Sequence, residues 1–213
     1  MKKIFLIGFG LSCLVGLNSC DKTSTDTTPD AELHAAFAEF DADAYTIYTS
    51  GNDVIIETTG LPNHTSPYWS NTHPLYVAPT VTTAADMAPG NIDDFNGSYS
   101  LTVSVSPEKA TSSTSTGLGA IGLAVSGSVI YNDEEGPNVQ LTESTANGFD
   151  YSGAHNGPTG YHYHLEASGV TENTTLSSND SDLVGISSDG FLIYGRKCNA
   201  TNDYPTDLDL SGG

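Results

Sequence analysis

Hydrophobic positions between residues 40 and 210 fall into short segments rich in Val, Ile, Thr and Tyr, separated by Gly, Ser, Asn and Asp. No long segment shows the 3.6-residue period of a helix. The clearest segment, GSYSLTVSVS, places one set of apolar side chains on one face of a strand: Tyr99, Leu101, Val103 and Val105. The pattern predicts an all-β fold, a single β-sandwich or barrel-like domain with long loops.

Two kinds of strand–turn–strand unit are predicted. Residues 45–58 form a hairpin with its turn at 51–53. IGLAVSGSVIY (121–131) aligns without gaps with VGISSDGFLIY (184–194), and each copy predicts two strands joined by a Ser-Gly or Asp-Gly turn. The second copy places Asp189 at this turn, either as a preferred turn residue of the scaffold or as a side chain that faces a site.

The chain begins with two lysines and an apolar run, residues 4–17, that is too short for a membrane span and fits a signal peptide. The run ends in LNSC, which resembles a lipoprotein signal. We therefore expect residues 1–19 to be removed and Cys20 to carry lipid. A plain secretory signal is the alternative and implies the same compartment. The sequence thus predicts a bacterial cell-envelope protein anchored to a membrane through Cys20, facing the periplasm or the surface.

Residues 20–40 are predicted to be the lipidated cysteine and a flexible tether, because DKTSTDTTPD contains no apolar residue. Within that range AELHAAFAEF predicts one or two helical turns with His34 exposed. Residues 41–213 then form one β domain. With Cys13 removed and Cys20 lipidated, Cys198 is the remaining cysteine, so no intramolecular disulfide is expected.

The chain is strongly acidic, with 6 basic and 26 acidic residues and a formal charge of −20. Loss of Lys2 and Lys3 with the signal peptide would leave 4 basic residues and a charge of −22. Such a surface repels nucleic acid and anionic lipid headgroups, which excludes nucleic-acid binding as a function. Because the acidic residues are scattered, we interpret them as a solubilising surface and not as a dedicated cation store.

The segment GPTGYHYHLE carries the candidate chemistry. On a strand, residues two apart share a face, so His162 and His164 point the same way and Glu166 continues that face. Tyr161 and Tyr163 point to the opposite face, where they can pack. Two imidazoles on one face can chelate a transition metal such as zinc, copper, nickel or iron. Strand histidines that merely hydrogen-bond their neighbours are the alternative.

Further ligands must come from elsewhere in the chain. His155 precedes the motif across the Gly-rich turn NGPTG, and His64 lies in GLPNH. Three of the six histidines fall within ten residues, flanked by glycines that permit close approach of a ligand. This clustering favours a metal site.

Four segments occur in the order in which they occur in the YHYH domain family: GLPNH (60–64), IGLAVSG (121–127), DYSGAHNGPTGYHYH (150–164) and LVGISSDGFLIYG (183–195). The chain resembles this family, which is named for the motif at residues 161–164, over roughly residues 45–197. The resemblance implies a secreted or envelope protein. It places five residues at motif positions: His64, His155, His162, His164 and Asp189. Ala154 and Phe191-Leu192 depart from the residues common in the family, and neither change removes a candidate ligand.

The leading hypothesis is an envelope lipoprotein that binds copper or zinc without turnover. The ligands would be His64, His155, His162 and His164, and Glu166 or Asp189 would add a ligand or orient an imidazole. A metal-free β-sandwich module that binds a partner is the first alternative. A metal-dependent hydrolase or oxidase, with Glu166 or Asp189 as general base, is the second.

Overall fold

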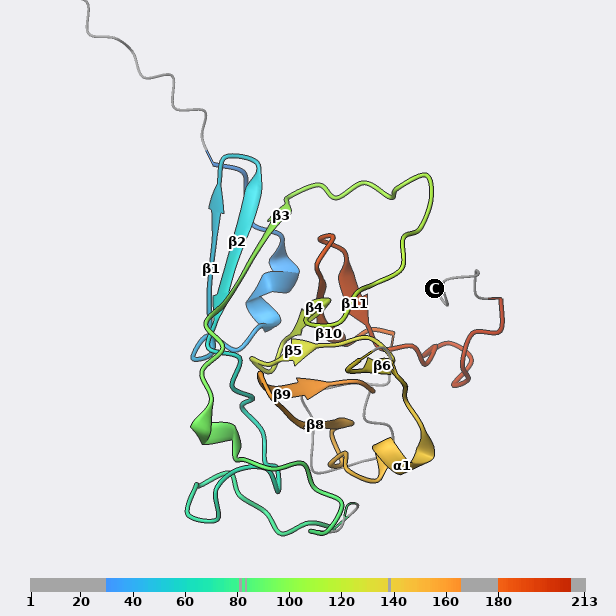
Figure 1. Ribbon diagram of the computed structural model, residues 1–213. Helices are drawn as coiled ribbons and strands as arrows, with labels where there is room; N and C mark the ends of the chain where they lie inside the picture. The colour runs from blue at the N-terminus through green and yellow to red at the C-terminus, as the bar shows by residue number, and fades with distance from the viewer. Residues whose placement is uncertain (1–29, 81, 83, 138, 166–179, 208–213) are drawn as a thin grey trace, which may run out of the picture.

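The computed structural model describes residues 30–80, 82, 84–137, 139–165 and 180–207. Within this part of the chain the regular structure is mainly strands in three sheets, which confirms the predicted all-β class (Figure 1). No helix in the described residues is long and apolar enough to cross a membrane. The predicted signal peptide and Cys20 lie outside the described residues.

The first sheet has three antiparallel strands in the order β1-β2-β3: β1 (Tyr45–Ser50), β2 (Asp53–Thr58) and β3 (Tyr99–Ser104). Strands β1 and β2 form the predicted hairpin, with Ser50 opposite Asp53. On β3, Tyr99, Leu101 and Val103 face the core, as the alternating pattern predicted.

The second sheet has six strands in the order β11-β10-β4-β5-β9-β8. Their bounds are β4 (Gly122–Ala124), β5 (Val129–Ile130), β8 (Ala154–Gly157), β9 (Gly160–Tyr163), β10 (Leu183–Ser187) and β11 (Leu192–Tyr194). All neighbouring pairs are antiparallel except β5 and β9. The strand order places β9 and β8 at the end of the sheet away from β11.

The two similar sequences form the hairpins β4–β5 and β10–β11, as predicted, and β4 lies directly beside β10. The matched glycines are needed where these strands meet. A Cβ at Gly185 would lie 2.2 Å from the carbonyl oxygen of Leu123, and one at Gly122 would lie 2.7 Å from that of Ile186. Side chains there would force the two hairpins apart.

The remaining elements are short. They comprise the two-stranded β6 (Glu134–Glu135) and β7 (Val139–Gln140), the helix α1 (Glu143–Ala146), and the 3-10 helices η1 (Ala35–Glu39) and η2 (Ile92–Asp94). Helix η1 confirms the helical turn predicted in AELHAAFAEF, and His34, just before it, is exposed as expected.

Two hydrophobic clusters lie on the two faces of the six-stranded sheet. One cluster joins this sheet to the first sheet and to η1, through side chains such as Ile56, Val103, Ile186 and Phe37. The other packs Tyr161 and Tyr163 of β9 against residues of the long segment between β2 and β3, which include Tyr68, Trp69 and Ile92. Strand β9 is therefore covered on its tyrosine face by this long segment (Figure 1).

Candidate metal centre

The β8–β9 hairpin brings three histidines together. His155 on β8 is directly opposite His162 on β9, and His164 follows β9 by one residue. Gly160 adopts a positive φ of 121° at the turn. Gly157 permits the close packing of the His162 ring, because a Cβ there would lie 2.7 Å from the ring atom Cε1 of His162. Gly157 thus permits the close packing of a histidine ring, whereas the approach of a ligand that the sequence indicated stays a prediction.

A carboxylate from β6 completes the group. Nε2 of His155 lies 2.8 Å from Oε1 of Glu135, and Nε2 of His164 lies 3.3 Å from the same oxygen. Nε2 of His162 lies 3.0 Å from Nε2 of His164. The four candidate ligand atoms all lie within 4.8 Å of one another, so the group could hold a metal ion.

Backbone carbonyls determine which ring nitrogen faces the centre. Nδ1–H of His162 donates to the Gly160 carbonyl at 3.0 Å, and Nδ1–H of His164 donates to the Asn132 carbonyl at 2.6 Å. In each neutral ring Nε2 then carries the lone pair. Two lone pairs facing each other at 3.0 Å repel, and a cation between them satisfies both. Carbonyl acceptors of this kind orient the histidines of metal sites.

His155 and Glu135 also place two polar atoms close together without a hydrogen bond between them. Their atoms Nε2 and Oε1 are close enough for an ion pair, yet both are buried and neither makes a hydrogen bond of acceptable geometry within the described residues. A contact with poor alignment gains little, so both atoms remain without an effective partner. Buried polar atoms without a partner are rare and costly. Here both atoms point toward the position that an ion would occupy.

Two of the histidines, His155 and His162, favour the neutral form that binds metal. Burial, followed by the nearby His162 and His164, lowers the pKa of His155 to about 3. Burial is also the main cause that lowers the pKa of His162 to about 4. Neither ring must therefore lose a proton to bind metal near neutral pH.

Aromatic rings enclose the group on two sides. Phe149 stacks on His164 with a centroid distance of 5.3 Å and meets His155 edge-on at 4.9 Å. Tyr131 stacks on His162 at 4.0 Å, with 24° between the ring planes. These rings, and not those of Tyr161 and Tyr163, shield the centre from water.

The geometry agrees with a small coordination sphere. A tetrahedral site with ligand bonds of about 2.0–2.1 Å has ligand atoms about 3.3 Å apart. Three of the six distances among the four ligand atoms are 2.8, 3.0 and 3.3 Å, and the others are no longer than 4.8 Å, so the group is compact enough to close around one ion. Three imidazole nitrogens and one carboxylate oxygen suit zinc or divalent copper, and they lack the sulfur donors that monovalent copper prefers.

The structure differs from the expected ligand set at His64. This histidine is buried on the tyrosine face of β9, where its Nε2 lies 2.6 Å from the hydroxyl of Tyr163 and its Nδ1 lies 2.8 Å from the carbonyl of Thr65. Burial lowers its pKa. The alternation along β9 explains the difference, since the side chain that meets Tyr163 is on the face opposite to His162.

The tyrosines of the motif anchor β9 through a buried polar network. The Tyr163 hydroxyl also lies 2.6 Å from Oγ of Ser126, and the Tyr161 hydroxyl donates to the Asp150 carboxylate at 2.7 Å. Asp150 also accepts from Oγ of Ser66 at 2.5 Å and from the backbone N–H of Ser152 at 2.8 Å. The motif thus contributes metal-ligand candidates on one face and hydrogen-bonded anchors on the other.

Asp189 also lies apart from the group. It is exposed in the turn between β10 and β11, where it accepts a hydrogen bond from Oγ of Ser187. Strands β4 and β5 separate β10 from β9 in the sheet, so the turn interpretation of this aspartate agrees with the structure. Glu166 lies outside the described residues.

Sequence reasoning missed Glu135. It belongs to the run NDEEGPN, which reads as an acidic surface turn, and it is 20 residues before His155. No local signal in this run identifies it, because the chain that leaves β5 reaches the histidine face only through the pairing of β5 with β9. Tyr131 and Asn132, directly after β5, already contact His162 and His164.

A protein-family model described as "YHYH protein" matches residues 100–209, just over half of the chain. The matched region contains Glu135, His155, His162 and His164 but not His64. No curated protein and no solved structure matches the chain.

Proposed function

The chain belongs to the YHYH protein family, and from the geometry of its histidine group we propose that it is a cell-envelope lipoprotein that binds copper or zinc without turnover. The observation that carries this proposal is the pair of Nε2 atoms of His162 and His164, 3.0 Å apart, with each Nδ1–H held by a carbonyl. A metal-free module would leave these lone pairs opposed inside the protein. The metal-free alternative is disfavoured for this reason.

Binding without turnover is favoured over catalysis for two reasons. First, four protein donors would be enough for a closed tetrahedral set, whereas catalytic zinc sites keep one position for water or substrate. Second, a cavity that touches His164 has a volume of about 170 Å³ and is otherwise lined by Ile130, Tyr163, Leu165, Val184, Ile193 and Tyr194. This is below the usual size of a ligand pocket, and its walls offer no carboxylate base.

The four candidate donors favour divalent metal ions of intermediate softness over other metal ions. Neutral imidazoles with a carboxylate bind zinc and divalent copper well, and the order of divalent affinities favours copper where both are free. The envelope is a compartment where copper is encountered, so both metals are retained in the proposal.

The proposed location in the cell envelope rests on residues 1–19, which resemble a lipoprotein signal peptide, and on Cys20. Several acyl chains on Cys20 would anchor the chain firmly, since each buried methylene contributes about 0.8 kcal/mol. Replacing Cys20 with serine is expected to move the chain from the membrane fraction to the soluble envelope fraction or to leave it unprocessed. Equal membrane retention of the Cys20→Ser variant would refute the lipid anchor while leaving the metal proposal intact.

The test of metal binding is the metal content of the tag-free chain. We expect about one copper or zinc ion per chain by elemental analysis, or uptake of one ion when the EDTA-treated protein is titrated with Zn²⁺ or Cu²⁺. A polyhistidine tag must be absent, because it would bind the same ions. A folded chain that takes up neither metal would overturn the proposed function.

A further inference from the structure

The four candidate ligands come from two separate parts of the fold. His155, His162 and His164 lie on or next to the β8–β9 hairpin, which belongs to the six-stranded sheet. Glu135 lies on β6, which pairs only with β7 among the described strands and forms a small ribbon with it (Figure 1). Three ligands are therefore fixed to one another by the main sheet, and the fourth reaches them from the β6–β7 ribbon.

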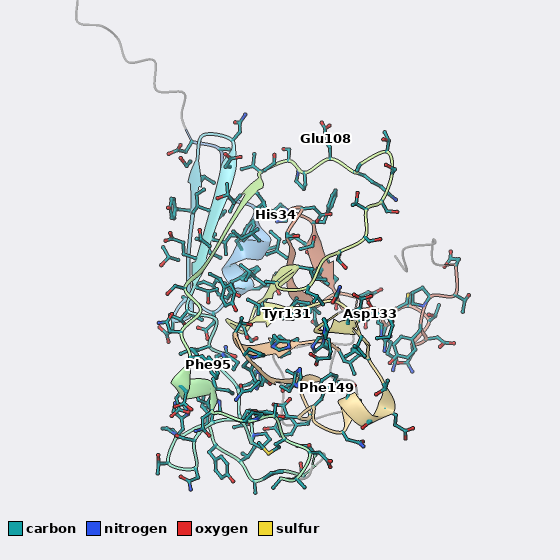
Figure 2. All side chains as sticks on the ribbon, in the orientation of Figure 1. His34, Phe95, Glu108, Tyr131, Asp133 and Phe149 are labelled. Carbon is teal, nitrogen blue, oxygen red and sulfur yellow. The ribbon has the colours of Figure 1, made fainter. Side chains whose placement is uncertain are left out.

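Contacts on several sides hold the three imidazoles in place. The rings of His162 and His164 are fixed by backbone carbonyls at Nδ1. Tyr131 and Phe149, which are labelled in Figure 2, stack on these two rings. The side chain of His164 has no exposed area, and that of His155 is 12% exposed. A histidine can leave the group only if these contacts are disturbed.

Glu135 is the most accessible member of the group. Its side chain is 28% exposed, although Oε1, the atom nearest the histidines, is buried. Asp133 before it and Gly136 after it are both exposed. The neighbouring N–H of Glu134 donates to Oδ1 of Asn132 at 3.2 Å, which ties the ribbon to the end of β5. Rotation about the side-chain bonds of Glu135 can therefore carry its carboxylate toward solvent while the strands stay in place.

The chemistry of the ligands points in the same direction. Imidazole suits zinc and copper, whereas a carboxylate is better suited to harder ions. If the Glu135 carboxylate leaves the group, water can hydrate it, because the side chain already reaches the surface. A histidine that left an ion would instead place a buried nitrogen without a partner, which is costly. In a loaded site the bond to Glu135 would therefore open first.

We propose that Glu135 is the ligand at which the site exchanges its ion with an external metal carrier that presents nitrogen or oxygen donors. The Glu135 carboxylate moves out, and a donor atom of the carrier takes its position before the three histidines release the ion. The bond from the ion to Oε1 breaks and one bond to the external donor forms, while the charge of the ion stays the same. This inference rests on the proposed metal binding and makes the chain a metal donor or acceptor, in contrast to a protein with a permanent structural ion.

The first test asks whether an external donor can occupy the position of Glu135. The tag-free full chain is loaded with Co²⁺, whose visible absorption reports its coordination. Glu135→Ala should keep the ion on three histidines with one open position, so added acetate should bind saturably and shift the absorption toward that of the wild type. Glu135→Gln fills the position with an amide, and acetate should change its absorption little. Circular dichroism checks the fold of each variant.

Two control variants separate exchange at Glu135 from the simple loss of a ligand. His155→Ala also removes one ligand, but its position is enclosed beside Phe149, so added imidazole should not restore the absorption. Asp133→Asn removes an exposed negative charge two residues from Glu135 and should behave as the wild type. The inference would be overturned by a Glu135→Ala site that ignores acetate, or by equally complete restoration of His155→Ala with imidazole.

The second test measures transfer of Zn²⁺ from the loaded chain to the chelator 4-(2-pyridylazo)resorcinol in stopped flow. The wild-type rate should rise with the chelator concentration, because the incoming donor takes the place of Glu135 before the histidines release the ion. Glu135→Ala should transfer its ion about tenfold faster or more, since each ligand of such a site contributes at least that much to affinity. A rate independent of chelator concentration, or unchanged in Glu135→Ala, would overturn exchange at Glu135 alone. A wild-type chain that takes up neither Co²⁺ nor Zn²⁺ would overturn the proposed function itself.

Discussion

Replacing His162 and His164 together with alanine is expected to abolish stoichiometric metal binding while the sheets stay folded. Structural zinc sites gain about 10–16 kcal/mol from about four ligands, so each lost ligand should weaken affinity by about 100-fold or more. His162 lies within β9 and His164 follows that strand, and removal of their rings leaves the Tyr161 and Tyr163 anchors on the other face in place. Titration with Zn²⁺ and Cu²⁺, with circular dichroism as a check of folding, measures the effect.

The matched control removes two histidines that lie outside the group. His34 is exposed before η1, and His73 stacks on Trp69 at a centroid distance of 3.9 Å. The His34→Ala/His73→Ala variant has the same number of histidines as the test variant and should keep full metal binding. Equal loss of metal in both variants would show that binding is nonspecific chelation and would contradict a site on β8 and β9.

Replacing Asp150 with alanine is expected to destabilise the fold by about 3–5 kcal/mol, because three buried donors lose their acceptor. Asp150 is 3% exposed and accepts hydrogen bonds from Ser66, Ser152 and Tyr161. Burial raises its pKa, and the hydrogen bonds from those donors oppose that rise. Urea unfolding in the presence of EDTA measures the effect without a contribution from bound metal.

Asp93 provides the control for this substitution. It is an exposed aspartate that also accepts hydrogen bonds from a serine, both from the backbone N–H and from Oγ of Ser70. Water can replace its oxygens, so Asp93→Ala should cost less than about 1 kcal/mol. An equally small loss of unfolding free energy in Asp150→Ala and Asp93→Ala would contradict the role of the buried network in stabilising the tyrosine face of β9.

Much of the scaffold could be predicted from local sequence. The hairpin of β1 and β2, the inward face of β3 and the two similar hairpins follow from alternation and from turn residues, which act over a few neighbours. The opposite directions of the histidines and tyrosines on β9 follow from the two-residue period of a strand in the same way. These predictions depended on no contact between distant segments.

The complete ligand set could not be predicted, because it depends on the pairing of distant strands. The parallel pairing of β5 with β9 brings Glu135 to the histidines. The long segment between β2 and β3 brings His64 to the other side of the same strand, where it bonds Tyr163. A histidine count and a family motif do not distinguish these two faces, whereas the pairing of the strands does.

The closeness of three ligands along the chain has a consequence for the order of assembly. His155, His162 and His164 lie within ten residues and are joined by one tight hairpin. Such hairpins form in about 1–10 μs, well before the distant strands of a β domain pair. If the group holds an ion as proposed, the nascent hairpin would be able to capture it before Glu135 and the rest of the sheet assemble around it. If the chain also folds after export, as proposed, the metal content of that compartment would affect the rate of folding as well as the occupancy of the site.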